Sequence, residues 1–211
     1  MTSARLPLFP LGLVLFPGVS VPLHLFEPRY RQLLTDVRDT DRRFGIVCGI
    51  PGTAERELPA GRVGCIAEVT EIEMLPDGRS NIVVVGRERF ALAQIHTDDA
   101  PYLIADVTPL PDLTEASAVM LAVLADDVVS HFGRVVKAVR TLNDDHESSA
   151  PTLPDDPSQL AWSVASMIDV ELEQRQRLLA ERSASARLDQ MNAVLRNALP
   201  DLELRAAMHA R

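Results

Sequence analysis

Lysine is almost absent from this sequence, because Lys137 is the only lysine among 21 basic residues and the others are arginines. Aromatic residues make up only 4% of the chain, so leucine, valine and isoleucine must fill any core. Positive charge is also scarce, since 30 acidic residues give a net charge of −9. An acidic surface repels phosphate backbones and anionic lipids, so we expect neither nucleic acid nor membrane as a partner.

Cysteines and long apolar runs are scarce as well. Cys48 and Cys65 are the only cysteines, they fall in separate predicted strands, and no paired histidines accompany them. We therefore expect two buried, reduced thiols and no metal or cofactor. No apolar run reaches the ~18 residues of a membrane span, and the N-terminus lacks the continuous apolar region of a signal peptide. These features predict a cytoplasmic protein.

The first 34 residues contain three short apolar segments, 6–11, 13–16 and 19–26, which prolines interrupt or bound. Proline cannot donate to a β-ladder, so we expect short strands at edges, bends or barrel corners rather than a long central strand. Pro28 then suits the first turn of a helix. Residues at helical spacing predict the buried face of this helix: Tyr30, Leu33, Leu34 and Val37.

Further strands follow up to residue 110. A buried strand over 42–50 precedes a long strand over 62–75, whose imperfect alternation predicts a bulge. Asp77-Gly78 predicts a hairpin turn into a return strand over 81–87. Segments 88–98 and 102–110 predict a second antiparallel pair. The first half is therefore expected to be one helix within a six- to eight-strand meander or partly closed barrel.

The remaining sequence has helical periodicity. The predicted helices begin after Thr114, after Asp156, near Val170 and after either Ser183 or Ser185, and Pro200 is expected to close the last one. Their matching apolar stripes predict a four-helix bundle. The predicted fold class is thus α+β, with a mostly antiparallel β subdomain over 1–112 followed by a helical subdomain over 113–211.

Four motifs of the first half carry a family resemblance: LPLFPL, VLFPG, PLHLFEPRYRQL and RFGIV. Together they resemble the substrate-binding N-terminal domain of the Lon proteases, which also occurs as a stand-alone protein in many bacteria. The resemblance implies a PUA-like pseudo-barrel for the β part. It also implies a protein that binds polypeptide substrates.

Catalytic machinery of the Lon type is not found in the sequence. A phosphate-binding loop needs G-x-x-x-x-G-K-[ST], and a Ser-Lys dyad needs a lysine in a site. Lys137, in VVKAV within a predicted helix, fits neither pattern. We therefore predict a non-enzymatic protein without catalytic residues.

Five other groups of residues allow a functional and a structural interpretation. They are His24 with Glu27, residues 144–147 (DDHE), His96 with Asp98 and Asp99, Asp127 with His131 and Arg134, and Trp162. An acid–base pair or a metal site needs partners that converge from separate positions, and none is evident. We favour a half-buried strand histidine, solvated charges on loops and a helix face, and an interdomain anchor for Trp162.

A binding surface remains as the predicted functional feature. Proline-limited edge strands or a groove between barrel and bundle would suit an extended peptide, and the residues predicted to contact it are Leu13, Leu15, Phe16, Val19 and His24. The expected partners are unfolded or degron-bearing polypeptides, with a protease or ATPase as a further partner, and the expected state is a monomer or weak homodimer. The alternatives are a small-molecule binder or hydrolase with a pocket between barrel and bundle, and RNA binding.

Overall fold

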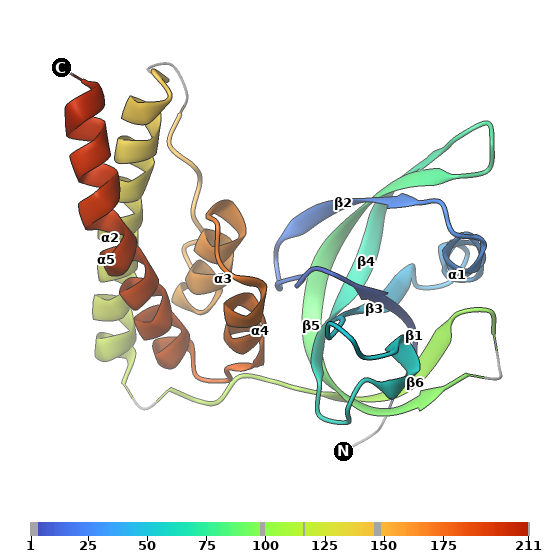
Figure 1. The fold of residues 1–211 in the computed structure, drawn as a ribbon. Helices are drawn as coiled ribbons and strands as arrows, with labels where there is room; N and C mark the ends of the chain where they lie inside the picture. Colours follow the sequence, from blue (N-terminus) through green and yellow to red (C-terminus); the bar gives the residue numbers. More distant parts are fainter. Residues whose placement is uncertain (1–3, 98–99, 116, 146–148, 211) are drawn as a thin grey trace. The chain divides into compact units, whose positions relative to one another are not determined.

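The computed structural model describes residues 4–97, 100–115, 117–145 and 149–210, and it confirms the α+β fold class. The chain forms two compact units (Figure 1). The β-rich unit comprises Met1–Pro111 and Val170–Ala180, and the helical unit comprises Asp112–Asp169 and Glu181–Arg211. Neither unit is therefore continuous in sequence.

Six strands build the sheet of the β-rich unit. They are β1 (Ala4–Leu11), β2 (Ser20–Leu25), β3 (Arg43–Cys48), β4 (Val63–Met74), β5 (Ser80–His96) and β6 (Leu103–Pro109). Their order is β2-β5-β4-β3-β1-β6, and β5 also pairs with β6. Five strands thus close into a ring, and β2 is added to the first half of β5. All pairs are antiparallel except β1 with β3, which agrees with the expected pseudo-barrel.

Strand β1 differs from the expectation for a proline-containing segment, because it pairs on both sides. Its first half, which contains Pro7, pairs with β6, and its second half, which contains Pro10, pairs with β3. Only Leu8 takes part in both ladders. Each proline thus lies where the strand has one partner, so its missing N–H can face the unpaired side.

Strands β4 and β5 form the predicted hairpin around Gly78, whose φ of 80° suits glycine. The predicted bulge is present as register shifts at Cys65/Ala67 and Val69/Glu71. The segments expected as two strands, 81–87 and 88–98, contribute instead to the single strand β5. It spans 17 residues because it bends around the barrel and pairs in turn with β2, β4 and β6.

Helix α1 (Pro28–Arg38) begins at the predicted proline and buries the predicted face of Tyr30, Leu33, Leu34 and Val37. The Tyr30 ring packs on Phe9 of β1, with 3.8 Å between ring centroids. One cluster of buried residues places the Phe90 ring among aliphatic side chains from β1, β3, β5 and β6. This composition agrees with the low aromatic content of the chain.

Helix α4 (Leu172–Ala180) was expected in the helical bundle but belongs to the β-rich unit. Its buried Gln176 side chain donates to the Val63 carbonyl of β4 (3.0 Å). The buried Arg89 guanidinium of β5 donates to the Leu179 carbonyl (2.6 Å). These two polar contacts, together with the buried Leu178 and Leu179, attach α4 to the sheet.

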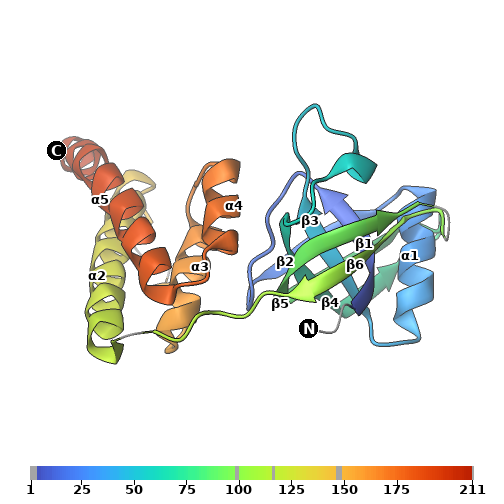
Figure 2. The ribbon, with the colours of Figure 1, turned by 90° about the horizontal axis from the view of Figure 1, so that it is seen from below.

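The helical unit contains α2 (Ala118–Leu142), α3 (Pro157–Met167) and α5 (Ala184–His209). Helices α2 and α5 pack side by side (Figures 1 and 2). They run parallel, because contacts pair residue 131 with 192 and residue 134 with 203. None of the helices described here combines the length and the apolar character needed to cross a membrane.

The helix ends confirm two of the predicted caps. The Asp156 side chain caps α3 through the Ser158 amide (2.9 Å), and Ser183 caps α5 through the Ala186 amide (3.2 Å). The cap of α2 is Ser117 rather than the predicted Thr114. The prediction that Pro200 closes the last helix is wrong, because α5 continues to His209. Pro200 is exposed, so water can reach the backbone carbonyl that loses its donor.

Candidate functional site

The turn before β2 places the predicted peptide-binding residues at different depths. Leu15 and Phe16 are each 1% exposed and belong to the core, whereas Leu13 and Val19 are half-buried. The turn lies close to β5, where a Cβ on Gly86 would be 2.0 Å from the Phe16 carbonyl oxygen. Leu15 and Phe16 therefore pack in the core beneath the turn, whereas Leu13 and Val19 are partly exposed at the surface.

Strand β2 is an edge, since among the described strand pairings it has one partner, β5. The Gly86 amide donates to the Val19 carbonyl (2.9 Å), and bonding alternates along an antiparallel pair. By this alternation Ser20, Pro22 and His24 direct their backbone groups away from β5. Pro22 has no N–H to offer, so two amides and three carbonyls face outward on this edge.

His24 is exposed and lies on the outer face of the three strands β2, β5 and β4. Its Nδ1 is 2.7 Å from the Asn81 amide oxygen, and the Asn81 nitrogen donates to Glu73 (2.7 Å). The other ring nitrogen is 3.4 Å from the Arg79 guanidinium. These side chains border a hollow of about 360 Å³, which is lined by Pro22, Leu23, His24, Glu71, Ile72, Glu73, Asn81, Ile82 and Val83. The lining thus combines apolar side chains with two carboxylates, those of Glu71 and Glu73.

Glu27 does not contact His24, so the structure does not form the acid–base pair. It instead accepts from Arg29 (2.9 Å), as the structural interpretation predicted. Arg29 also forms a bidentate pair with Glu55 (2.5 and 3.0 Å) and lies 4.4 Å from the centre of the Tyr30 ring. Burial raises the pKa of the Tyr30 phenol well above its ordinary value. This group fastens the start of α1 to the loop after β3.

The histidine and acidic groups named as metal candidates form pairs. His96 contacts Asp106 (3.1 Å) and His209 contacts Asp144 (3.0 Å), while residues 98, 99, 146 and 147 lie outside the described ranges. Within residues 4–97, 100–115, 117–145 and 149–210, no three such side chains are placed to hold a metal ion. Each pair has the geometry of an ordinary surface contact.

The polar face of α2 contacts α5 rather than forming a site. His131 is 3.0 Å from the Asn192 side chain, and Arg134 forms a bidentate pair with Glu203 (2.9 Å for both contacts). The Asn192 nitrogen donates to the Leu124 carbonyl (3.1 Å). These contacts set the register between the two parallel helices.

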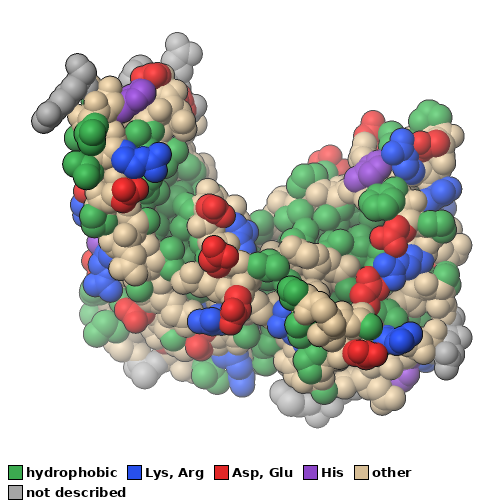
Figure 3. All heavy atoms as spheres, viewed as in Figure 1, with side chains coloured by type: hydrophobic (Ala, Val, Ile, Leu, Met, Phe, Trp, Pro, Cys, Tyr) green, Lys and Arg blue, Asp and Glu red, His purple; other side chains and the backbone are tan. Residues whose placement is uncertain are grey.

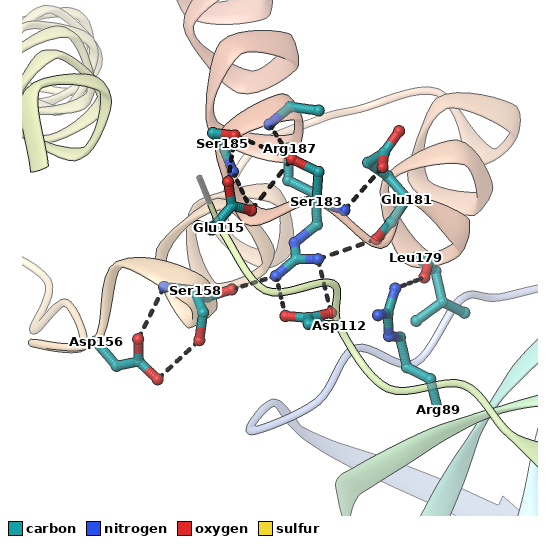
Figure 4. A network of polar contacts seen from close by, with 11 residues as sticks. Arg89, Asp112, Glu115, Asp156, Ser158, Leu179, Glu181, Ser183, Ser185 and Arg187 are labelled. Carbon is teal, nitrogen blue, oxygen red and sulfur yellow. Dashed lines mark hydrogen bonds and ion pairs between the residues drawn. The ribbon is translucent and has the colours of Figure 1, made fainter. Parts of the chain in front are cut away.

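The centre of the helical unit is the fully buried Arg187 guanidinium (Figure 4). It forms a bidentate pair with Asp112 (3.0 and 2.7 Å) and donates to the carbonyls of Glu181 and Ser158 (2.9 Å each). Its flat face lies 4.0 Å from the centre of the Trp162 ring. This cation–π contact lies within the helical unit and helps to fix the connection between its helices. The interdomain role expected for Trp162 stays a prediction.

Comparison with known proteins identifies the family. The family model for the ATP-dependent protease La (LON) substrate-binding domain matches residues 5–197. The chain belongs to this family. Its sequence is similar to the Lon protease of Rhizobium meliloti (strain 1021), with 29% identity over 99% of this chain and 26% of that protein. It is also similar to Lon protease 2 of Herpetosiphon aurantiacus, with 29% identity over 96% of this chain and 25% of that protein.

The LON domain described here thus spans about a quarter of the length of these curated relatives. Two solved structures share its fold. The Lon N-terminal domain protein from Xanthomonas campestris has a TM-score of 0.61 at 24% identity, and the match covers 90% of this chain and 98% of that one. The N-terminal domain of a Mycobacterium avium complex Lon protease has a TM-score of 0.68 at 18% identity and covers 93% and 100%.

Two features of this LON domain were missed at the sequence level. Arg187 lies on the apolar face of α5 beside Leu188 and Met191, and a charge in that position is the signal that would have indicated a buried pair. The network of His24 with Asn81 gave no such signal, because the two residues are 57 positions apart and meet only through strand pairing.

Proposed function

We propose that this LON domain binds segments of polypeptide chains without modifying them, as an adaptor in proteolysis or protein quality control within the cytoplasm. The observation that carries the proposal is the match of a substrate-binding family over nearly the whole chain. The match concerns the substrate-binding domain and not the ATPase or peptidase modules of Lon. A partner protease or ATPase would then act on the bound chain.

The exposed edge of β2 is the proposed contact surface. An extended peptide can bond to the outward amides of Ser20 and His24, and the half-buried Leu13 and Val19 offer apolar contacts nearby. Leu15 and Phe16 hold this surface in place from the core. The missing N–H of Pro22 limits continuous strand addition, which favours short, reversible binding over aggregation.

Charge adds selectivity to this surface. Glu71 and Glu73 border the hollow at His24, and the whole chain carries a net charge of −9. Long-range attraction therefore favours clients with basic residues near their apolar segments. Binding of such clients should weaken as ionic strength rises.

A binding experiment with an unfolded client tests the proposal. A reduced and alkylated, fluorescently labelled model protein should bind saturably, whereas its native form should not. The double variant His24→Ala, Asn81→Ala should weaken binding several-fold, because it removes side chains that border the hollow. The control His209→Ala changes an exposed histidine of the helical unit and should bind as the parent does.

The client should also keep its length when it is incubated with the protein and ATP, as judged by gel electrophoresis. Absence of saturable binding by folded protein would refute the proposal. Cleavage of the client would refute its non-catalytic part.

The alternative functions find no supporting contact. Among the described residues, neither His24 nor His131 is hydrogen bonded to a carboxylate, which a hydrolase site would require. On the visible face of the β-rich unit in Figure 3, basic and acidic side chains are interleaved. This pattern does not favour RNA, which binds best to a continuous basic surface.

A further inference from the structure

A second hollow lies between α1 and the β4–β5 hairpin. Its volume is about 390 Å³, and its lining comprises Pro28, Arg31, Gln32, Leu34, Thr35, Arg38, Met74, Gly78 and Ser80. It shares no lining residue with the hollow at His24. The two hollows therefore offer separate chemistry on the β-rich unit.

The guanidinium of Arg31 is the distinctive group of this hollow. Within the part of the chain that the structure describes, no hydrogen bond or ion pair engages it, although the residue is half-buried. Gly78 holds it in position: a Cβ at Gly78 would lie 2.2 Å from Nη2 of Arg31. The positive φ of Gly78 favours glycine at this turn.

Three acidic residues of α1, its C-cap and the β4–β5 turn pair with groups other than Arg31. They pair as follows: Asp36 with Tyr102 (2.7 Å), Asp39 with Arg38 (3.1 Å) and Asp77 with Arg79 (2.7 Å). The backbone amide and side chain of Arg79 lower the pKa of Asp77, so this carboxylate stays charged and bonded to its own turn. A positive group without a protein partner thus remains in an otherwise acidic protein.

Three of the residues that line the hollow are apolar. Leu34 and Pro28 contribute from α1, and Met74 contributes a thioether side chain that is 58% exposed. Methionine is flexible and adapts to side chains of different shape. The hollow therefore combines one directed positive charge with an adaptable apolar contact.

We propose that this hollow binds the C-terminal carboxylate of a polypeptide together with its last, apolar side chain. A carboxylate accepts two parallel bonds from a guanidinium, which is a strong and directional contact. A chain end carries the carboxylate and a side chain on the same carbon, matching the charged and apolar residues that line the hollow. The inference rests on the proposed function, because it specifies which part of a client this second hollow holds.

The size of the hollow favours a chain end over an internal acidic residue. Its volume is near the lower end of the ~300–1,000 Å³ range of small-ligand pockets. An internal aspartate would need room for the chain to enter and to leave. At a chain end, the polypeptide has to leave the hollow in one direction only. One or two residues can therefore fill the hollow while the rest of the client extends outward.

Fluorescence anisotropy with synthetic peptides tests this proposal. The probe is a fluorescein-labelled Gly-Ser-Gly-Ser-Ala-Leu peptide with a free C-terminal carboxylate. The same peptide with a C-terminal amide should bind at least about tenfold more weakly, which is the effect of losing one charge-assisted contact. An amidated peptide with aspartate in place of alanine should bind as weakly as the plain amide.

Variants of the protein locate the site. The Arg31→Gln protein should no longer prefer the peptide with the free carboxylate. The Arg31→Lys protein should keep part of this preference, because lysine retains the positive charge but lacks the planar guanidinium that donates two parallel bonds. Arg56→Gln is the matched control, since its exposed side chain has only a 3.8 Å contact with Glu57. Circular dichroism should show all three variants folded, because the Arg31 side chain has no described hydrogen bond to lose. On binding, the backbone amide signal of Gly78 should shift in NMR spectra.

Equal binding of the acid and amide peptides, or unchanged binding by Arg31→Gln, would overturn the inference. Tight binding of the amidated aspartate peptide would overturn the assignment to a chain end. An unfolded client with an amidated C-terminus distinguishes this inference from the proposed function. Amidation removes the group that would bind at Arg31, but the client should still bind at the β2 surface. Loss of that binding would count against the proposed function and not against this site.

Discussion

Arg187 shows how one residue can hold a set of helices together. Its guanidinium is fully buried, and its pair Asp112 is about one-third exposed. One carbonyl partner, Glu181, lies between α4 and α5, and the other, Ser158, lies in the first turn of α3. A buried charge is costly unless several groups bond to it. Here the ion pair, two carbonyls and the Trp162 ring share that role.

Substitution of Arg187 should therefore strongly destabilise the helical unit. Arg187→Ala removes every one of these contacts and should lower the free energy of unfolding by about 3–5 kcal/mol, the usual cost of breaking a buried ion pair. Trp162 is the only tryptophan, so its fluorescence during urea titration reports this unit. The control Arg205→Ala, which removes an exposed pair with Asp201, should cost no more than ~1 kcal/mol. Similar unfolding midpoints for both variants would contradict this role of Arg187.

Helix α2 carries a glycine in its interior, at position 133. A Cβ at this position would have no other atom within 4 Å, so the helix gains nothing in packing from glycine. Glycine costs about 0.5–1 kcal/mol relative to alanine in a helix, because the unfolded chain has more freedom to lose.

The substitution Gly133→Ala should accordingly stabilise the helical unit by about 0.5–1 kcal/mol. The measurement is the urea midpoint followed by Trp162 fluorescence, as for Arg187. A destabilised variant would show that the space beside Gly133 is needed for packing. Gly45→Ala provides a contrast in the β-rich unit, because its Cβ would lie 2.8 Å from Leu8 and Phe90 side chains.

Elements with strong local signals were predictable from the sequence. The start and buried face of α1, the Gly78 hairpin and the capped start of α3 depend on residues that are neighbours in the chain. Their structure follows from local dihedral preferences and periodicity. The sequence therefore predicts these elements without knowledge of the remaining fold.

Elements whose state depends on distant partners were not predictable. Strand β1 tolerates two prolines because its partner changes at Leu8, and α5 continues past Pro200 because Leu199 and Ala206 remain buried on its packed side. Helix α4 has a helical pattern, yet its attachment to β4 rests on Gln176, a residue that periodicity alone marks as polar. The surface at His24 likewise arises only once β2 has paired with β5.

At the scale of the whole molecule, buried thiol and phenol groups with raised pKa values lie in the β-rich unit. Burial raises the pKa of Cys65 from 9.0 to about 12 and that of Tyr102 from 10.0 to about 12, and it also raises the pKa of Cys48. A raised pKa means that the folded protein keeps its proton while the unfolded chain has already released it. The corresponding stability is complete below pH ~9 and is lost as pH rises toward ~12.

The β-rich unit should therefore unfold at alkaline pH before the helical unit does. Urea titrations at pH 8, 9.5 and 11 should show a falling midpoint by far-UV circular dichroism, with a smaller change in Trp162 fluorescence. Cys65→Ala should reduce the steepness of this decline, since it removes one of the buried groups whose pKa is raised. A midpoint that is constant from pH 8 to 11 would contradict the burial of these protons.

The interleaving of the two units also has a consequence for biosynthesis. A ribosome completes the six strands by residue 109, yet the helix that donates to the Val63 carbonyl arrives only with residues 170–180. Helix α2 likewise waits for α5, which is made after α4. Domains that are continuous in sequence can mature one after the other during translation. In this chain, both units reach their final form only when residues 170–209 have emerged, so they mature nearly together.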